Sequence, residues 1–158
     1  MREDSKKKLN ELKLSPNIPS IFKTVLNKEY AFAQAEEYLD AMIISREYQN
    51  GLETFGNIHS RAKMIIATNY GLIFIEEGDD EPGAEIAGFK IQHVLYSKIS
   101  SVELDMCLLA GSFVIHTDFG NRTGIEIKFN TAQYQYEFAR FLEVVRNQQI
   151  EFLMLKQY

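Results

Sequence analysis

The sequence is poor in residues that cross-link a small protein or mark a redox site. It has one cysteine, Cys107, and no tryptophan among 158 residues. A single cysteine excludes an intrachain disulfide and a CxxC motif. We therefore expect apolar packing to stabilise the fold. Eleven phenylalanines and eight tyrosines would supply its large side chains, and Cys107 would be a small buried one.

Long hydrophobic runs and export signals are also missing. No apolar stretch approaches the roughly 18 residues of a membrane-spanning helix. The first residues, MREDSKKKLNELK, lack the apolar region of a secretory signal. We expect a cytoplasmic protein, and we interpret the glycosylation sequon at 121–123 as a hairpin turn.

An excess of positive charge is absent as well. The chain has 17 basic and 22 acidic residues, for a formal net charge of −5. Nucleic acids and anionic membranes attract proteins that carry a positive field. The composition therefore argues against nucleic-acid binding and predicts only weak attraction to anionic lipid.

Catalytic motifs are missing too. The sequence contains no GxSxG, GxGxxG, P-loop or HExxH pattern. His59, His93 and His116 are far apart, and no residues have metal-ligand spacing. We predict no catalytic residues, no cofactor and no metal site, and an enzyme of an unrecognised kind is the weakest of our alternatives.

What the chain does contain is a helical region followed by strands and a final helix. Residues 1–13 are expected to form a polar helix, and Ser15–Ser20 a break with turn chemistry. Ser20 then caps a helix that we expect to continue towards Tyr38. Its apolar residues recur with helical spacing and are Ile21, Phe22, Val25 and Leu26.

From about residue 40 the apolar residues alternate, which is typical of half-buried strands. An acidic stretch at 76–85 is predicted to be a solvated loop. Seven short strands between turn signals favour a sandwich or barrel. We expect them at 41–48, 64–69, 71–77, 88–96, 99–106, 112–117 and 125–129.

The helical period returns after Asn130, which is expected to cap a helix from 131 to about 147. Its apolar face is Phe138, Phe141, Leu142 and Val145. Such a helix can close the open end of two crossed sheets. The expected core consists of Ile66, Leu72, Phe74, Ile99, Val102, Leu104, Phe113, Ile115, Ile127, Phe138, Phe141 and Leu142.

The order of four strand motifs resembles that of bacterial pleckstrin-homology-like domains, in particular the YokE-like family. The motifs are ATNYGLIFI, LYSKISSVELD, LLAGSFVIHTDFG and IEIKF, followed by a helix. Tyr96, Ile99 and Val102 match one family motif, and 115–117 (Ile-His-Thr) another. Gly71 stands where that family often has arginine. The resemblance covers roughly 62–145, and more loosely from about 40.

The resemblance implies a mainly β fold with helices. Residues 39–158 would form a barrel of about seven antiparallel strands, in two near-orthogonal sheets capped by the C-terminal helix. Residues 1–38 would form an N-terminal helical extension.

Leu108 and Leu109 correspond to the family's leucine-rich turn. They either fold back over the barrel as core residues or form an exposed tip that docks a partner.

Apolar segments outside the barrel suggest a second contact. Ile21 and Phe22 lie near one end of the chain, and Phe152, Leu153 and Leu155 near the other. We expect these two segments to meet, either within one protomer or between two copies.

The function that we predict is a non-catalytic interaction module that binds a protein partner or its own copies. The alternative is an adaptor for membrane lipid. Eukaryotic pleckstrin-homology domains hold phosphoinositides with many basic residues near the first hairpin. Here that region offers only Arg46, Arg61 and Lys63 as a weak anion site.

Overall fold

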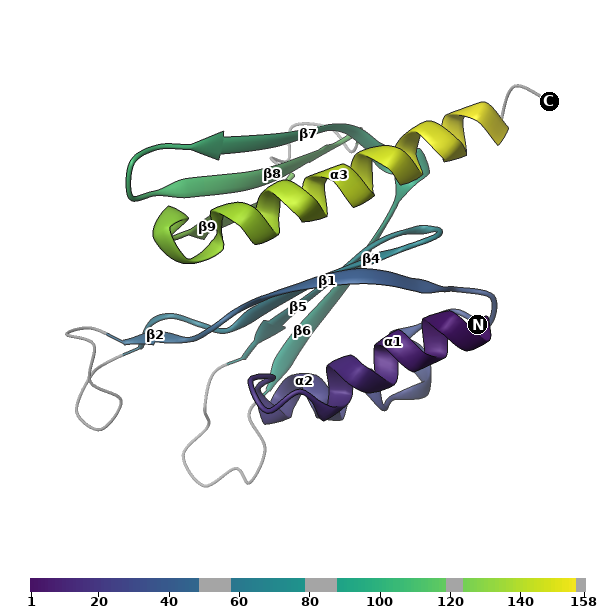
Figure 1. Cartoon of the computed structure of the whole chain (residues 1–158), viewed down its shortest axis with the longest axis horizontal. Helices are drawn as coiled ribbons and strands as arrows, with labels where there is room; N and C mark the ends of the chain where they lie inside the picture. Colours follow the sequence, from purple (N-terminus) through teal and green to yellow (C-terminus); the bar gives the residue numbers. More distant parts are fainter. Residues whose placement is uncertain (49–57, 79–87, 119–123, 156–158) are drawn as a thin grey trace.

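The computed structural model describes residues 1–48, 58–78, 88–118 and 124–155. The helices α1 (Glu3–Leu14) and α2 (Ser20–Leu26) and the short 3-10 helix η1 (Glu29–Ala31) come first. They precede a set of antiparallel strands and the long helix α3 (Thr131–Leu155) (Figure 1).

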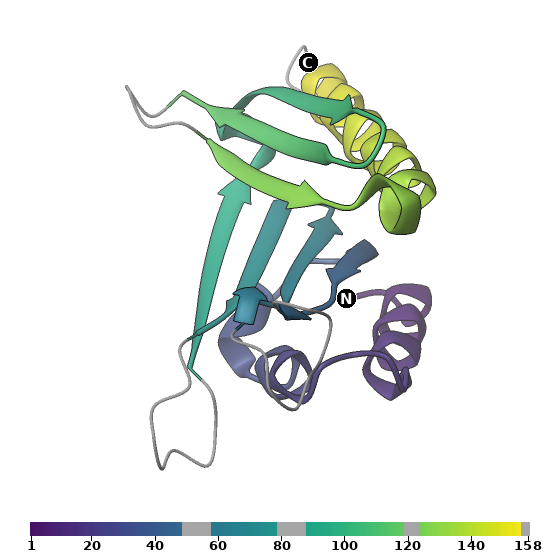
Figure 2. The same ribbon diagram turned by 90° about the vertical axis from the view of Figure 1, so that its left-hand side faces the viewer.

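The strands form two main sheets and a short ribbon. The four-stranded sheet has the order β1-β4-β5-β6, with β1 (Tyr38–Ile44), β4 (Lys63–Thr68), β5 (Gly71–Glu77) and β6 (Phe89–Leu95). The 3-10 helix η3 (Tyr96–Lys98) leads to the three-stranded sheet β7 (Ile99–Met106), β8 (Gly111–Thr117) and β9 (Ile125–Phe129). The ribbon pairs β2 (Glu47–Tyr48) with β3 (Ile58–Ser60). Figure 2 shows that the strands of the two main sheets cross at a steep angle.

Helix α3 closes one side of the space between these sheets, since it contacts both β1 and β7. Asn130 Oδ1 accepts a hydrogen bond from Ala132 N at 2.9 Å, so the predicted cap is confirmed. Phe138 stacks on Phe129 with ring centroids 4.0 Å apart and lies 5.5 Å from Phe113. The predicted closing helix is therefore present, and it continues to Leu155 instead of ending near 147.

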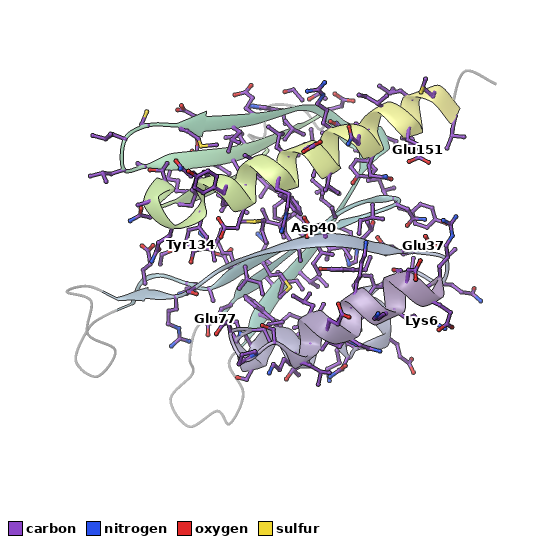
Figure 3. The ribbon with its side chains drawn as sticks, in the orientation of Figure 1. Lys6, Glu37, Asp40, Glu77, Tyr134 and Glu151 are labelled. Carbon is purple, nitrogen blue, oxygen red and sulfur yellow. The ribbon has the colours of Figure 1, made fainter. Side chains whose placement is uncertain are left out.

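Polar contacts also join α3 to β1. Arg140 Nη2 lies 3.2 Å from Asp40 Oδ1, and Ser45 N donates to the Tyr134 hydroxyl at 3.1 Å. Asp40 and Tyr134 are labelled in Figure 3, which shows them between strand and helix. The capping helix is held by a buried aromatic cluster and by these two contacts near its edge.

The helices α1 and α2 cover the other face of the four-stranded sheet (Figure 1). Phe22 and Val25 of α2 are fully buried there, together with Ile66 and Ile73 of the sheet. Burial on both faces explains why β4 and β5 are almost continuously apolar instead of alternating. The four-stranded sheet is thus the central layer, which packs against the N-terminal helices on one face and against the second sheet and α3 on the other.

Gly71 is required by a close approach of β5 to β6. A Cβ atom at this position would lie 2.1 Å from Val94 O, which no side chain tolerates. Glycine permits the contact because it has no Cβ. This packing accounts for glycine where the resembled family often has arginine.

Mainly β architecture with two antiparallel sheets, a C-terminal helix and N-terminal helices is confirmed. Two further predicted boundaries are wrong. The second helix ends at Leu26 rather than continuing towards Tyr38, because the backbone at Lys28 is already extended. The strand expected at 41–48 begins at Tyr38 and is interrupted after Ile44.

Three residues of the predicted core are only half-buried, namely Val102, Leu104 and Leu142. Val102 and Leu104 lie on β7, an edge strand of its sheet, and an edge has a neighbouring strand on one side only. Cys107 is exposed rather than buried, because it follows the end of β7. The sequon at 121–123 and most of the acidic loop, 79–85, lie outside the described residues.

Candidate functional site

Leu108 and Leu109 form an exposed turn between β7 and β8. Their exposed fractions are 92% and 70%. Cys107 N donates to Ala110 O at 2.9 Å, and Thr131 Oγ1 donates to Leu108 O at 3.2 Å. The turn therefore has a fixed backbone with apolar side chains in solvent, and the alternative that it is buried core is wrong.

Met106 extends this apolar surface, with an exposed fraction of 41%. The strands β7 and β8 hold the turn at the end of their hairpin, beside the first turn of α3 (Figure 1). Leu108 and Leu109 lie beyond the end of this hairpin, and within the described residues no other element covers their side chains. We call Met106, Leu108 and Leu109 the Leu108–Leu109 turn below.

The predicted basic residues lie at one end of the four-stranded sheet. Arg46 follows β1, Arg61 precedes β4 and Lys63 begins β4. Strand pairing places Ile44 beside Lys63. The structure therefore brings this region of the sequence together, as the anion-site hypothesis requires.

Carboxylates share that end of the sheet, however. Arg46 Nε donates to Glu77 Oε2 at 3.0 Å, and Lys63 Nζ lies 3.9 Å from Glu76 Oε1. Glu77 is only 7% exposed and also accepts a hydrogen bond from Ala62 N at 3.2 Å. The Arg46–Glu77 ion pair is thus part of the folded structure, and the positive charge of Arg46 is already balanced by the carboxylate of Glu77.

The C-terminal end of α3 is a second apolar surface, and it extends beyond the sheets in Figure 1. Its exposed residues include Leu153 and Leu155, at 59% and 72%. Ile150 and Met154 are exposed too and lie one helical turn apart. Phe152 is half-buried and packs against the core between the sheets, so it is not an exposed contact residue.

Ile21 and Phe22 were expected to meet the C-terminal apolar segment, either within one protomer or as a contact between two copies, but both are buried by another part of this chain, with exposed fractions of 5% and 0%. They pack on the face of the four-stranded sheet opposite α3. The expected meeting of the two apolar segments is therefore wrong, because the central sheet separates them. The sheet itself covers the N-terminal segment.

A cleft of about 710 Å³ opens between β6 and β9, on the side of the sandwich that α3 does not close. Its apolar floor includes Phe74, Val94 and Ile127, and its rim carries Lys90 and Lys98. The sequence analysis missed this cleft. A signal for it was present, because β6 places Lys90 and Gln92 on the face where β4 and β5 are mainly apolar.

The three histidines were not expected to bind metal. In the described ranges, no group of three or more His, Cys, Asp or Glu side chains is placed to hold a metal ion. His116 Nε2 lies 3.1 Å from Glu103 Oε1 on the neighbouring strand.

Among the described helices, none is long and apolar enough to cross a membrane.

No protein-family model and no curated protein matches the sequence. One solved structure is similar, that of a DUF1696-family protein with a pleckstrin-homology domain from Shewanella loihica PV-4. The sequences are 13% identical, the match covers 78% of this chain and 98% of that chain, and the TM-score is 0.42. The fold is defined by the chain's own architecture, in which two crossed antiparallel sheets of four and three strands are closed by a C-terminal helix, as expected of a pleckstrin-homology-like domain.

Proposed function

We propose that this chain is a non-catalytic interaction module that binds a protein partner, or a second copy of itself, through the Leu108–Leu109 turn. The observation that carries the proposal is the exposure of two adjacent leucines, at 92% and 70%, on a turn whose backbone is held by hydrogen bonds. A fixed turn loses little conformational entropy on binding, so burial of its apolar side chains favours association.

The free energy expected from burying the two leucines also supports a binding role for the turn. Burying a leucine side chain contributes roughly 1.5–3 kcal/mol, and Leu108 and Leu109 lie side by side. An exposed apolar patch with polar surroundings is typical of protein contact sites. The C-terminal end of α3, with Leu153 and Leu155 exposed, offers a second surface for self-association.

Membership of the YokE-like family is part of this proposal, and it rests on the sequence motifs around Tyr96 and 115–117. A cytoplasmic location likewise stays a prediction from the sequence. The lipid-adaptor alternative has less support, because two of its three basic residues, Arg46 and Lys63, face Glu77 and Glu76. A phosphorylated headgroup needs several converging cations or N–H donors.

Cys107, the only cysteine of the chain, offers a direct test because it is exposed beside the turn. A maleimide carrying a photo-crosslinker is attached to Cys107, and the labelled protein is illuminated at increasing concentration and in a lysate. Crosslinked dimers or a crosslinked partner are expected, and the double variant Leu108→Ser/Leu109→Ser should lose them. The matched control is Leu14→Ser, which changes an equally exposed leucine (81%) on α1.

Two results would contradict the proposal. Crosslinks that are equally strong in the double variant would mean that the leucines do not contribute to binding. The second result is that the protein sediments with vesicles containing phosphatidylglycerol, that salt abolishes this sedimentation, and that no crosslink to protein forms. This result would favour the lipid-adaptor alternative.

A further inference from the structure

The cleft between β6 and β9 is bordered by two strand edges. Within the described residues, β6 pairs with β5 only and β9 with β8 only. Residues of both strands line the cleft, including His93 and Leu95 of β6 and Ile125 of β9. Since α3 closes the opposite side through β1 and β7, this cleft is the side of the sandwich that no described element closes.

The hydrogen-bond pattern of β5 and β6 shows which backbone groups point into the open side. Tyr96 N donates to Tyr70 O at 3.0 Å, and Gly78 N donates to Gly88 O at 2.6 Å. The register between these two pairs is unbroken. Directly opposed residues of an antiparallel pair alternate between bonded and non-bonded positions.

It follows that the even-numbered residues of β6 bond to β5 and the odd-numbered residues direct their N–H and C=O groups outward. These outward residues are Phe89, Ile91, His93 and Leu95. An edge of unpaired backbone groups is a template for another strand. The seven residues of β6 give an edge of roughly 23 Å at about 3.3 Å per residue.

The side chains of the even-numbered residues lie on the inner face of the sheet. Val94 belongs to the core there, and the register continues this face through Gln92 to Lys90. Lys63, Glu76 and Lys90 form one row across β4, β5 and β6. Lys63 approaches Glu76 at 3.9 Å, so the row has one more cation than carboxylate.

We infer that the β6 edge accepts an extended peptide segment of a partner protein as an additional strand, with an acidic side chain directed at Lys90. The outward N–H and C=O groups require a backbone as their partner, which an extended peptide supplies. A neutral apolar strand in the same place would bury Lys90 without a counter-charge, which costs free energy. The lysine therefore selects an acidic segment over a neutral or basic one.

This site is separate from the proposed function at the Leu108–Leu109 turn. Neither leucine lines the cleft, so either proposal can fail while the other holds. The partner segment is defined by its chemistry, namely an extended strand with carboxylates at alternate positions. Alternation places those carboxylates on one face of the added strand, towards the inner face that carries Lys90.

Binding is tested by fluorescence anisotropy with two labelled heptapeptides, one alternating Val and Glu and one alternating Val and Lys. We expect the Glu peptide to bind at least about tenfold more tightly, a difference of about 1.4 kcal/mol. The variant Lys90→Glu should remove or reverse that preference. Lys8→Glu is the matched control, because it makes the same charge change at an exposed site on α1, which packs on the far face of the sheet.

The variant His93→Pro tests the backbone contact, since it removes one outward N–H and leaves the β5–β6 bonds in place. It should weaken binding of the Glu peptide about tenfold. If the variant is unstable, the peptide is changed instead, by N-methylation of either its odd or its even positions. One of these two methylated peptides should lose binding and the other should keep it.

Four results would overturn the inference. The first is equal affinity for the Glu and Lys peptides, and the second is full affinity of folded His93→Pro for the Glu peptide. The third is that both N-methylated peptides bind as well as the unmethylated one. Failure of the Glu peptide to bind the wild-type chain at all would overturn it as well.

Discussion

Thr68 Oγ1 donates a hydrogen bond of 2.7 Å to the buried carboxylate of Glu36. Glu36 precedes β1, and its other oxygen accepts a hydrogen bond from Ala33 N at 2.8 Å. The Thr68 hydroxyl also accepts hydrogen bonds from the backbone N–H groups of Tyr70 and Gly71. A single hydroxyl thus joins the N-terminal extension to the turn between β4 and β5.

Replacing Thr68 with valine should therefore destabilise the protein. The change keeps the shape of the side chain but leaves the Glu36 carboxylate and two turn N–H groups without this partner. Leaving a buried polar group unsatisfied costs about 1–3 kcal/mol, which urea denaturation would measure. Thr68→Ser retains the hydroxyl and serves as the control, and equal stability of the two variants would contradict the prediction.

The ion pair of Arg46 and Glu77 gives a second prediction. Arg46→Ala would leave the carboxylate of Glu77, 7% exposed, without its guanidinium partner (Glu77 is labelled in Figure 3). Breaking one side of a buried pair costs on the order of 3 kcal/mol, and we expect a comparable loss of unfolding free energy. Lys63→Ala is the control, because its pairing with Glu76, whose side chain is 43% exposed, should contribute less than about 1 kcal/mol.

A loss in Lys63→Ala as large as that in Arg46→Ala would contradict the prediction. It would mean that Lys63 also balances a buried charge.

Two buried tyrosines predict sensitivity to alkaline pH. Burial, and to a lesser extent Asp40, raises the pKa of Tyr38 to about 12, against the opposing effect of Arg140. Burial, and then Glu36, raises the pKa of Tyr96 above its ordinary value. Above about pH 10 the unfolded chain loses these protons before the folded chain does, so the folded state is progressively disfavoured.

The contribution of each tyrosine to the free energy of unfolding is therefore complete below about pH 10. The contribution of Tyr38 is lost as the pH rises towards about 12. Melting temperatures measured from about pH 9 to pH 11 should fall less steeply in Tyr38→Phe and Tyr96→Phe than in the wild type. Tyr136→Phe is the control, because Tyr136 is 79% exposed. Parallel curves for all four proteins would contradict the assignment.

The aromatic cluster below α3 gives a prediction about the core. Phe138 is fully buried and contacts Phe113 and Phe129, so Phe138→Ala should cost about 3–5 kcal/mol. Leu142 is only half-buried one turn later, so Leu142→Ala should cost less than about 2 kcal/mol, below the usual range for core leucines. Guanidinium denaturation measures both, and an equal cost would mean that Leu142 is as well packed as Phe138.

The local sequence pattern determined most of the secondary structure. Period-two alternation predicted β7 and β9, and the spacing of Phe138, Phe141 and Val145 predicted the closing helix with its Asn130 cap. These features follow from residues a few positions apart, because the pleat of a strand and the turn of a helix set the side-chain period.

The burial of Ile21 and Phe22 was decided by the tertiary structure alone. Their helical stripe is visible in the sequence, but the surface that covers it is the outer face of a sheet assembled from distant strands. An apolar stripe shows that burial is needed and does not show against what. That is why the sequence left open whether this stripe packs within the protomer or against a second copy, and did not identify the sheet that covers it.

The candidate surfaces depended on the tertiary structure for the same reason. The sequence left the burial of Leu108 and Leu109 open, because exposure depends on what lies beyond the end of a hairpin. Arg46 meets Glu77 across 31 positions of sequence. The cleft at β6 exists because α3 closes only one of the two sides of the sandwich. Local patterns fix the period of side chains along the chain, whereas charge pairing and open edges depend on which distant segments become neighbours.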